Sequence, residues 1–581
     1  MNRLYYLFFV SLFVLPFPTC ADPIDPSVAE AEAIGVGKES VPSRPDLEGP
    51  LVDPYVKLPL RIHDATSTSL LMRATQDIIE ATRVIVPAGS RPIRLVNVVK
   101  DTLQRNLVLQ SARKEPLIVG SDIDLEKAVF DPLAFARVTL SRENIPTAGF
   151  FAGGSGGTIS RVEQHFQGAG SPDGQAPGLG VTRKFQQGTE VTLRADYSRQ
   201  DSNVAFFQPL DQEYHTSFSA DATIPLMRGA GCYTNLAGIR IAYNNKRISE
   251  EELRRITIDS LRAAHHGYWE LVFGRVNLAI NQQSLALAAD LLRENRIRYK
   301  YGDLIAVDVY EAEAGVRERE QEVIQADNQL ENAMDDVRER VSMDRTHPDW
   351  EAPLTPIDPP VFVPVQVDED LSLQTAMEKN PDIRIARLNI NNAREGKVIA
   401  QDLFRPKLDI VAGVSERGLG ETWGQSHEEL ESGEFSSWHA GIDFEVPLYR
   451  RREKAEILKS NYTIHQAQLD LKEIEQRVVY DHRAAFRRIE DLERAVYASK
   501  SRVRAEKNRL EKQNIGHEQG ITTSHDLLEV QEDYAQAHVI EIRAIVDYYL
   551  ALIELEAIRG TILESFGFTF IPMEGDLRPP R

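Results

Sequence analysis

The feature that most constrains this chain is a pair of helical segments too long for any compact domain. Between residues 236 and 341 the sequence predicts two helices that meet near Gly302. The first would extend about 90 Å at 1.5 Å per residue, several times the length of an average globular helix. In the second, apolar residues recur every seven positions, at Val309, Val316, Val323, Leu330 and Val337. A sustained period of seven predicts a left-handed coiled coil, so the fold must be elongated.

The same pattern occurs a second time along the chain. A proline-rich stretch at residues 353–364 interrupts the first occurrence. The sequence then predicts a helix, a strand, an acidic loop, a second strand and long helices, at residues 371–401, 407–415, 416–436, 437–446 and from 450 onward. This recurrence indicates an internal duplication of one structural unit.

A shift of 218 residues aligns the two copies at their most distinctive positions. Gly520 falls on Gly302, and both glycines would allow a tight turn between coiled helices. Acidic residues follow each turn at matching places, Asp308 and Glu311 in the first copy and Asp526 and Glu529 in the second. Residues three apart share one face of a helix, so each pair would present two carboxylates together.

Alternating apolar and polar residues predict strands in the first copy. They lie at residues 135–142, 181–185, 189–197 and 217–224. The two middle runs flank Gln187-Gly188 and would form a hairpin. Two interpretations of residues 181–197 stay open, namely an extracellular loop or additional strands at the rim of a sheet.

Glycine and serine dominate residues 149–180, which predicts a flexible loop. A Gly-x-Ser-x-Gly sequence at residues 153–157 lies inside it. A nucleophile elbow needs a strand before the serine and a helix after it, and loop residues are expected on both sides here. We therefore interpret the motif as part of the loop and not as a hydrolase site.

Two predicted strands end at a proline, Pro225 in the first copy and Pro447 in the second. Proline has no N–H to donate to a ladder, and its fixed φ suits the turn into a helix. Because both occupy the same place in the duplicated unit, we expect them at the junctions between sheet and long helices.

The N-terminal region predicts export. Residues 1–21 combine an apolar run with small residues before Asp22, as in a secretory signal, and the run is shorter than the ~20 residues needed to span a bilayer. Lipidation of Cys20 is the alternative processing route. Residues 22–92 contain nine prolines, which predicts an extended arm with at most one short helix near residues 69–83.

Charge and motif content exclude several functional classes. The net charge of −21 disfavours a protein that binds nucleic acid by neutralising phosphates. No phosphate loop, HExxH motif or spaced Cys/His set occurs, so no catalytic residues, metal or cofactor are expected. His265 and His266 are adjacent, and on a helix they would point about 100° apart, which favours a structural role.

Four motifs together are similar to those of one family. They are Ile224-Pro225-Leu226-Met227-Arg228-Gly229-Ala230-Gly231, Tyr268-Trp269-Glu270-Leu271, Tyr301-Gly302 with Asp308, and Asn380-Pro381-Asp382-Ile383. Over about residues 93–566 the chain resembles the TolC-like outer membrane factor family. The resemblance implies a mainly α fold with β, in which a trimeric outer-membrane β-barrel of about four strands per protomer continues into a long periplasmic α-helical coiled-coil tunnel.

Combined with the duplication, the resemblance implies a division of the chain into six parts. They are a signal peptide, a Pro-rich arm, a first repeat, a linker, a second repeat and a C-terminal tail, at residues 1–21, 22–92, 93–352, 353–368, 369–566 and 567–581.

The implied function is a passive exit duct of a tripartite efflux pump or type I secretion system, gated at its periplasmic tip. Its partners would be two further copies, a periplasmic adaptor, an inner-membrane transporter and outer membrane lipid. Its place would be the outer membrane with a periplasmic extension. A periplasmic coiled-coil adaptor or structural protein is the alternative, and the exported substrate is not predicted.

The resemblance also assigns roles near the tip. Asp308, Glu311, Asp526 and Glu529 would form the pore constriction. The arginine and tyrosine that close the tip in the family are replaced here by Thr522 and His517, so the closing network must differ. His517 and His525 would make closure sensitive to pH.

Overall fold

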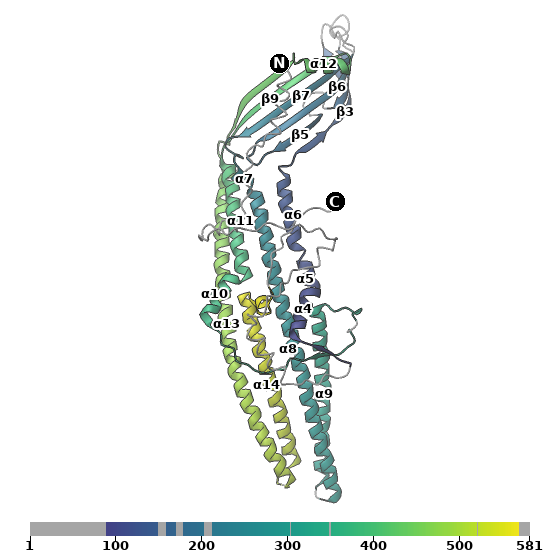
Figure 1. Cartoon of the computed structure of the whole chain (residues 1–581), viewed down its shortest axis with the longest axis vertical. Helices are drawn as coiled ribbons and strands as arrows, with labels where there is room; N and C mark the ends of the chain where they lie inside the picture. The colour runs from purple at the N-terminus through teal and green to yellow at the C-terminus, as the bar shows by residue number, and fades with distance from the viewer. Residues whose placement is uncertain are drawn as a thin grey trace, which may run out of the picture. The chain divides into compact units, whose positions relative to one another are not determined.

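The computed structural model describes residues 89–148, 159–169, 178–202, 212–302, 304–347, 350–519 and 521–568 (Figure 1). The expected signal peptide, Cys20, nearly all of the proline-rich arm, the Gly-x-Ser-x-Gly motif, Gly520 and most of the C-terminal tail lie outside these residues. The described residues divide between two compact units. We call the one with residues 120–245 and 390–467 the sheet unit, and the one with residues 246–389 and 468–581 the helical unit, which also includes residues 89–119.

The sheet unit contains one antiparallel sheet of eight strands (Figure 1). Its order is β10-β9-β7-β6-β4-β3, with β5 paired to β6 and β2 paired to β5. The strands are β2 Leu133–Ala136, β3 Val138–Ala148, β4 Ile159–Ala169, β5 Leu179–Lys184, β6 Glu190–Ser202, β7 Gln212–Pro225, β9 Lys407–Gly420 and β10 Ser436–Glu445.

The expected count of about four strands is too low, because the first copy contributes six of the eight. The expected hairpin at residues 181–197 forms as β5 and β6, and β6 pairs with β7 over twelve residues, so it belongs to the main sheet. The expected loop at residues 149–180 is wrong in its centre, where β4 lies. Apolar residues of β4 recur at 159, 162 and 166, which is not a two-residue alternation, and only pairing with β3 and β6 reveals the strand.

The expected acidic loop between β9 and β10 contains a helix, α12 (Trp423–Ser432). The Thr422 hydroxyl accepts a hydrogen bond from the Gln425 N–H, and Gly433 ends the helix with φ +67°. Thr216 of β7 donates from its hydroxyl to the Ser426 carbonyl at 2.8 Å, so the helix packs against the sheet. The segment is rich in acidic residues, so the sequence predicts a loop there. The main local indications of the helix are its caps, Thr422 and Gly433.

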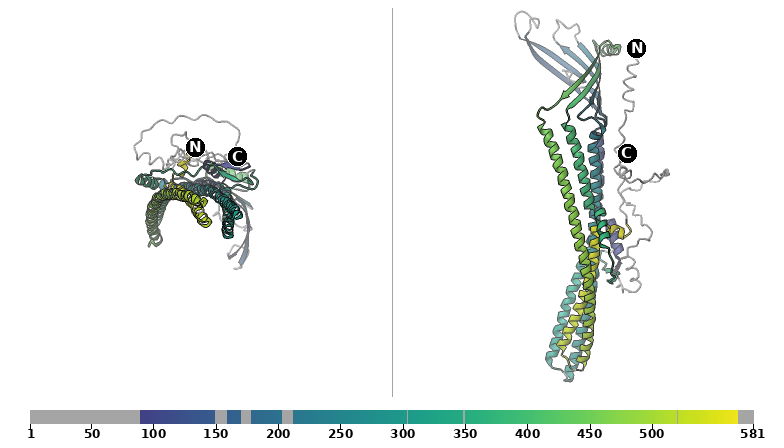
Figure 2. Two further views of the ribbon diagram at one scale, coloured as in Figure 1. Left: turned by 90° about the horizontal axis from the view of Figure 1, so that it is seen from below. Right: turned by 90° about the vertical axis from the view of Figure 1, so that its left-hand side faces the viewer.

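Long helices are confirmed in both copies. They are α8 Ala237–Tyr301, α9 Ala306–Val341, α13 Arg451–Glu518 and α14 Ser524–Arg559. Both α9 and α14 have 36 residues, and their bounds differ at each end by the expected 218 positions. In the helical unit α8 and α9 form one antiparallel hairpin, and α13 and α14 form the other (Figures 1 and 2).

Shorter elements complete the described chain. They are β1 Arg91–Ile93, α4 Leu95–Arg105, α5 Leu107–Ala112, α6 Glu115–Ala128, α7 Cys232–Asn235, β8 Leu354–Pro356, α10 Glu369–Lys379, α11 Pro381–Phe404 and α15 Ile562–Ser565. The single helix expected at residues 371–401 is broken between α10 and α11, because Pro381 has no N–H to continue it. Among the described residues, no helix is both long and apolar enough to cross a membrane.

The core of the helical unit is built on aromatic side chains. Tyr268 and Trp269 of α8 are 0% and 2% exposed, and the Trp269 ring stacks on Tyr549 of α14 at 4.5 Å. The Tyr268 hydroxyl donates to Asp358 at 2.6 Å, and the same carboxylate accepts the Leu95 N–H at 2.8 Å. These contacts attach α4 and the segment after β8 to the long helices.

We expect replacement of Trp269 by alanine to destabilise the helical unit by about 3–5 kcal/mol, because it removes a stacked, buried ring and leaves a cavity. Thermal unfolding of the purified protein, followed by circular dichroism, measures the loss. Tyr480→Ala is the matched control, since that ring is 68% exposed. Equal shifts of the unfolding midpoint in the two variants would contradict this assignment of the core.

Candidate functional site: the hairpin ends

We use "hairpin ends" for the two turns, between α8 and α9 and between α13 and α14. Gly302 follows α8 with φ +85°, a conformation that glycine adopts without strain, as expected. Asp308 occupies the third position of α9, and its carboxylate accepts the Ile305 N–H at 3.2 Å. This hydrogen bond satisfies one of the donors that the start of a helix leaves free.

The second hairpin end repeats this arrangement with an additional bond. Asp526 is the third residue of α14, and its carboxylate accepts the Thr523 N–H at 3.1 Å and the Thr523 hydroxyl at 2.7 Å. The Thr523 hydroxyl in turn accepts the Asp526 N–H at 3.2 Å. Hydrogen bonds from Thr523 lower the pKa of Asp526, so its carboxylate stays charged in mildly acidic solution. Both predicted aspartates therefore cap helices.

Glu311 and Glu529 lie one turn further along α9 and α14. Both are exposed, and among the described residues neither carboxylate has a hydrogen bond or ion pair. The four predicted carboxylates thus divide into two that cap helices and two that are exposed and unpaired among the described residues. In the part of the chain that the structure describes, no group of three or more His, Cys, Asp or Glu side chains could hold a metal ion.

A buried polar network joins the two hairpins and was not predicted. Asn295 of α8 is 0% exposed, and its amide donates to the Ser524 hydroxyl at 2.9 Å. Arg298 donates to the carbonyl of His517 at 3.1 Å, and the His517 ring lies 3.4 Å from the Ser524 hydroxyl. This network holds the end of α8 against the end of α13 and the start of α14. Nothing in the local pattern around Asn295 distinguishes it from an exposed asparagine.

The two histidines predicted to make closure sensitive to pH, His517 and His525, differ in their surroundings. His517 is 4% exposed and belongs to the network, whereas His525 is exposed at the start of α14. Thr522 also lies here, with its hydroxyl 3.5 Å from the Gln513 carbonyl. The pH sensitivity of closure stays a prediction, which a constant conductance between pH 5.5 and 8 would contradict.

Arg319 is a second unpredicted contact between the hairpins. Its side chain is 3% exposed and donates to Glu322 of α9 at 3.3 Å and to Glu532 of α14 at 3.2 Å. In the seven-residue pattern it occupies the same position as Ala312 and Ala326, both buried. A charged residue at a core position of the heptad is the indication that would have identified it.

His265 and His266 take the structural role expected of them. His265 is fully buried, its Nδ1 lies 2.7 Å from the Leu261 carbonyl, and burial lowers its pKa to about 4. His266 is exposed on another face of α8. Pro225 ends β7, and Pro447 lies between β10 and α13, so both stand between a strand and a long helix.

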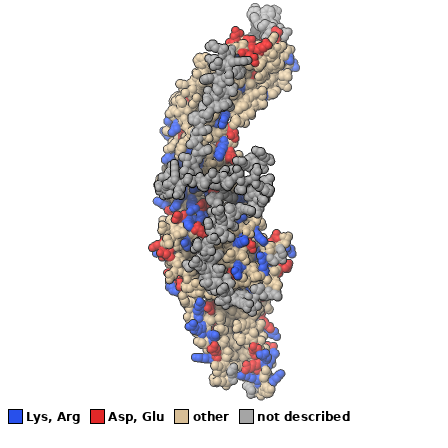
Figure 3. All heavy atoms as spheres, in the orientation of Figure 1, with Lys and Arg blue, Asp and Glu red and all other residues tan. Residues whose placement is uncertain are grey.

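Acidic and basic side chains are interspersed on the face of the helical unit that Figure 3 shows. Ion pairs also join helices of this unit, such as Arg509 of α13 with Asp533 of α14 at 2.7 Å. The acidic excess of the chain therefore does not form one uniform patch on this face.

Comparisons with known proteins agree with this architecture. Residues 372–561 match the family described as "Outer membrane efflux protein". The chain is 23% identical over 301 residues to "Outer membrane protein TolC" of Vibrio cholerae, which covers 51% of this chain and 67% of that protein. It is 24% identical over 198 residues to the Escherichia coli protein of the same name, covering 33% of this chain and 40% of that protein.

Solved structures share the fold at low identity. The outer-membrane channel OprN superimposes with a TM-score of 0.58 at 13% identity, covering 92% of this chain and 99% of that one. The Campylobacter jejuni CmeC outer membrane channel gives a TM-score of 0.57 at 12% identity, with 91% and 94% covered.

The repeated helical hairpins, the attached sheet and these matches define a class of non-enzymatic outer membrane channels. Residues 372–561 match the outer membrane efflux protein family, and the chain is TolC-like. The matched residues 372–561 run from within α10 to the end of α14, which is the second copy. The first copy carries the additional strands.

We expect Arg319→Ala to destabilise the contact between α9 and α14 by about 1–3 kcal/mol, because Glu532 loses a charged hydrogen-bond donor. Arg317→Ala is the control, since Arg317 pairs only with Glu320 of its own helix and is 68% exposed. Chemical unfolding of the purified protein measures both. An Arg319 variant as stable as the control would show that this buried charge contributes nothing net.

Proposed function

We propose that this chain is the passive exit duct of a tripartite efflux pump or a type I secretion system. It acts as a homotrimer in the outer membrane, with the helical hairpins in the periplasm and the gate at the hairpin ends. One observation carries the proposal. A sheet with an exposed apolar face is joined through α8 and α13 to two matched hairpins, whose ends present unpaired glutamates.

The apolar face of the sheet supports a membrane location. On β10, Trp438, Ile442 and Phe444 are 79%, 71% and 63% exposed, and on β3 Val138 and Leu140 are 75% and 73% exposed. Alternate residues of a strand point to one face, so these side chains form contiguous apolar surfaces. Exposing such surfaces to water is energetically unfavourable. Hydrocarbon is the medium that suits such a surface in an outer membrane protein.

The two edges of the sheet support assembly with further copies. Strands β3 and β10 end the pairing path, and each leaves one row of backbone donors and acceptors without a strand partner among the described residues. In hydrocarbon every such group must be satisfied, which pairing between identical copies achieves. Three copies are the number that the resemblance implies, and a periplasmic adaptor and inner-membrane transporter would complete the system.

Glu311 and Glu529, together with the capping Asp308 and Asp526, would form the constriction. Threefold repetition places each carboxylate three times around the passage, and a ring of carboxylates favours cations over anions. Because Asp526 stays charged in mild acid, part of this negative potential persists there. The capping role also fixes the aspartates in position, so the glutamates are the residues that can move when the hairpin ends separate.

We expect the full chain to be recovered as heat-resistant trimers in outer membrane fractions, because paired sheet edges are protected from water. Electrophoresis with and without boiling measures this. A photoreactive residue at Tyr310, 69% exposed on α9, should trap a periplasmic adaptor, whereas one at Trp438 on the sheet should not. A monomer released by osmotic shock would instead favour a periplasmic coiled-coil adaptor or structural protein.

We expect Glu529→Gln to lower the cation-to-anion permeability ratio several-fold in planar bilayers, because it removes three charges from the ring without changing side-chain size. Glu490→Gln on α13 is the control, since that side chain is 53% exposed and lies away from the hairpin ends. Reversal potentials in a salt gradient measure the ratio. An unchanged ratio would remove Glu529 from the constriction.

A further inference from the structure

The first copy contains an inserted hairpin that the second copy lacks. One arm of this inserted hairpin is made of β4 and β5, the other arm is β6, and both arms lie inside the sheet. Strands β4, β5 and β6 lie between β3 and β7 in the pairing path, whereas the second copy contributes only β9 and β10. β3 pairs with β4 over eleven residues, and β6 pairs with β7 over twelve. In the described residues, β3 and β7 are therefore not neighbours.

The eight strands form six continuous rows. β2 and β3 are separated by Arg137 alone, and β5 continues the direction of β4 along β6, with the pairing moving from residue 202 of β6 down to residue 190. One line of directly opposed residues crosses all six rows, at Ala134, Val181, Leu193, Ala220, Val414 and Trp438. Each protomer therefore contributes six strands to its sheet.

Strands β5 and β6 of the inserted hairpin have the same two faces as β7, β9 and β10, whereas β4 places Gln167 on the apolar side and Phe166 on the other side. The line from Ala134 to Trp438 is apolar throughout. The next line, on the opposite face, contains Phe135 and Gly180 followed by the polar residues Arg194, Ser219, Ser415 and Ser437. An apolar outer face and a polar inner face are what a strand needs in the wall of an outer-membrane pore. A loop outside the wall would have no reason to keep this register.

The turn of the hairpin is fixed to the segment between β7 and α8. The Gly231 N–H donates to the Gln187 carbonyl at 3.0 Å. Gly188 has φ +99°, and a Cβ there would lie 2.1 Å from the Gly229 carbonyl oxygen, so only glycine fits. Arg183 donates to the Phe130 carbonyl at 3.4 Å. The hairpin thus ends at the same level as the original strands.

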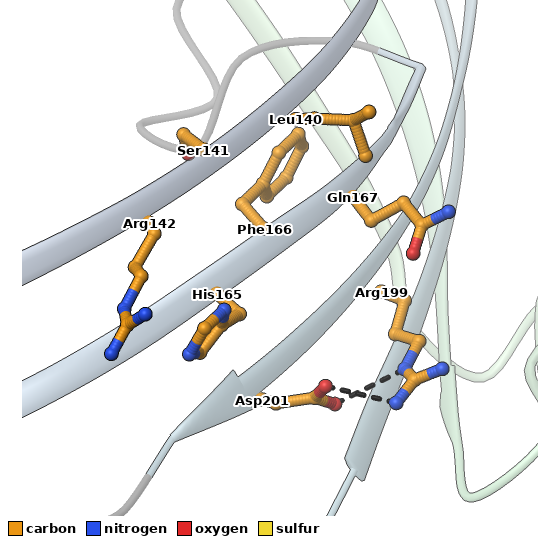
Figure 4. Close-up of a pocket in the computed structure, with 8 residues that line it drawn as sticks. All are labelled: Leu140, Ser141, Arg142, His165, Phe166, Gln167, Arg199 and Asp201. Atoms are coloured by element: carbon orange, nitrogen blue, oxygen red, sulfur yellow. Dashed lines mark hydrogen bonds and ion pairs between the residues drawn. The ribbon is translucent and has the colours of Figure 1, made fainter.

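The other end of the insertion also packs as part of the sheet. A pocket of about 370 Å³ is lined by side chains of β3, β4 and β6 (Figure 4). Leu140 of β3 lies opposite Gln167 of β4, whereas Phe166 lies opposite Ser141 and is 7% exposed. Arg199 and Asp201 of β6 form a two-fold hydrogen-bonded pair at 3.1 and 2.9 Å. The pocket is therefore lined by three adjacent strands, and the Arg199–Asp201 pair lies within β6.

We infer that the outer-membrane end of this protein is a closed ring of eighteen strands, six from each of three copies, and not the twelve that the family resemblance implies. The inference rests on the proposed trimer. Each free edge of the sheet pairs with the neighbouring protomer, so that β3 of one protomer is paired to β10 of the next. The inserted hairpin widens the ring without changing its edges.

Geometry supports six strands over four. In the sheet unit, contacts order the helices as one row: Lys127 of α6 lies over the Tyr243 ring of α8, Arg240 of α8 pairs with Glu395 of α11, and Arg450 before α13 lies over Phe404 of α11. Four helices at about 9.5 Å spacing occupy about 38 Å. Six strands at about 4.8 Å spacing and about 40° tilt also occupy about 38 Å, but four occupy only about 25 Å.

The width has a functional consequence. Eighteen strands at this tilt enclose a ring about 36 Å across between backbones, compared with about 24 Å for twelve. The opening in the membrane then matches the width of the helical row below it. The ring of strands would then be no narrower than the helical row. The size of the exported cargo would therefore be limited at the hairpin ends.

Cross-linking of paired cysteines in outer membrane fractions tests the strand order. Leu140→Cys combined with Gln167→Cys joins β3 to β4 and should cross-link within one chain, whereas Leu140→Cys combined with Ala220→Cys should not. Leu140→Cys combined in turn with Trp438→Cys, Ala440→Cys or Ile442→Cys should give links between chains. The chain without added cysteines is the control. A link between residues 140 and 220 would place the hairpin outside the ring and overturn the inference.

A strand count completes the test. Electron cryomicroscopy of the purified trimer should show eighteen strands, and deletion of residues 149–202 should reduce the ring to twelve, with its circumference falling 1.5-fold. Twelve strands in the full chain would overturn the inference and leave the proposed duct standing. Absence of any trimer would overturn the proposed function itself.

Discussion

The fold depends on contacts between helices that are too long to bury their apolar faces alone. In the helical unit, Trp269 of the first copy stacks on Tyr549 of the second, and Tyr268 fixes Asp358 and the start of α4 beside them. This core therefore contains side chains of both copies. The short strands β1 and β8 pair beside this core, and α4, α5 and α15 contribute to a second hydrophobic cluster.

The duplication is kept most strictly where backbone geometry demands it. α9 and α14 have equal length and begin with an aspartate at the same capping position. Side chains that face the partner helix diverge instead, since Arg319 corresponds to the buried Ala537 in the second copy. A capping aspartate serves any helix start, whereas a buried guanidinium needs one particular partner, Glu532.

The candidate site was only partly accessible to prediction. Spacing placed Asp308 and Asp526 after the turns, because that depends on positions in one helix. The spacing did not show that Asp308 and Asp526 cap helices. Because they do, Glu311 and Glu529 are the two of these four carboxylates that are unpaired among the described residues. The network of Asn295, His517 and Ser524 joins residues more than 200 positions apart, so no local pattern contains it.

The sequence by itself determined the elements whose signature is local. Heptads indicated α9, their recurrence after 218 residues indicated α14, and alternation indicated β6, β7, β9 and β10. The tertiary structure alone decided the rest: β4 exists because β3 and β6 pair with it, and α12 because its caps and the Thr216 hydroxyl hold it on the sheet. Pairing between strands is a non-local interaction, so the number of strands in the sheet was fixed only in three dimensions.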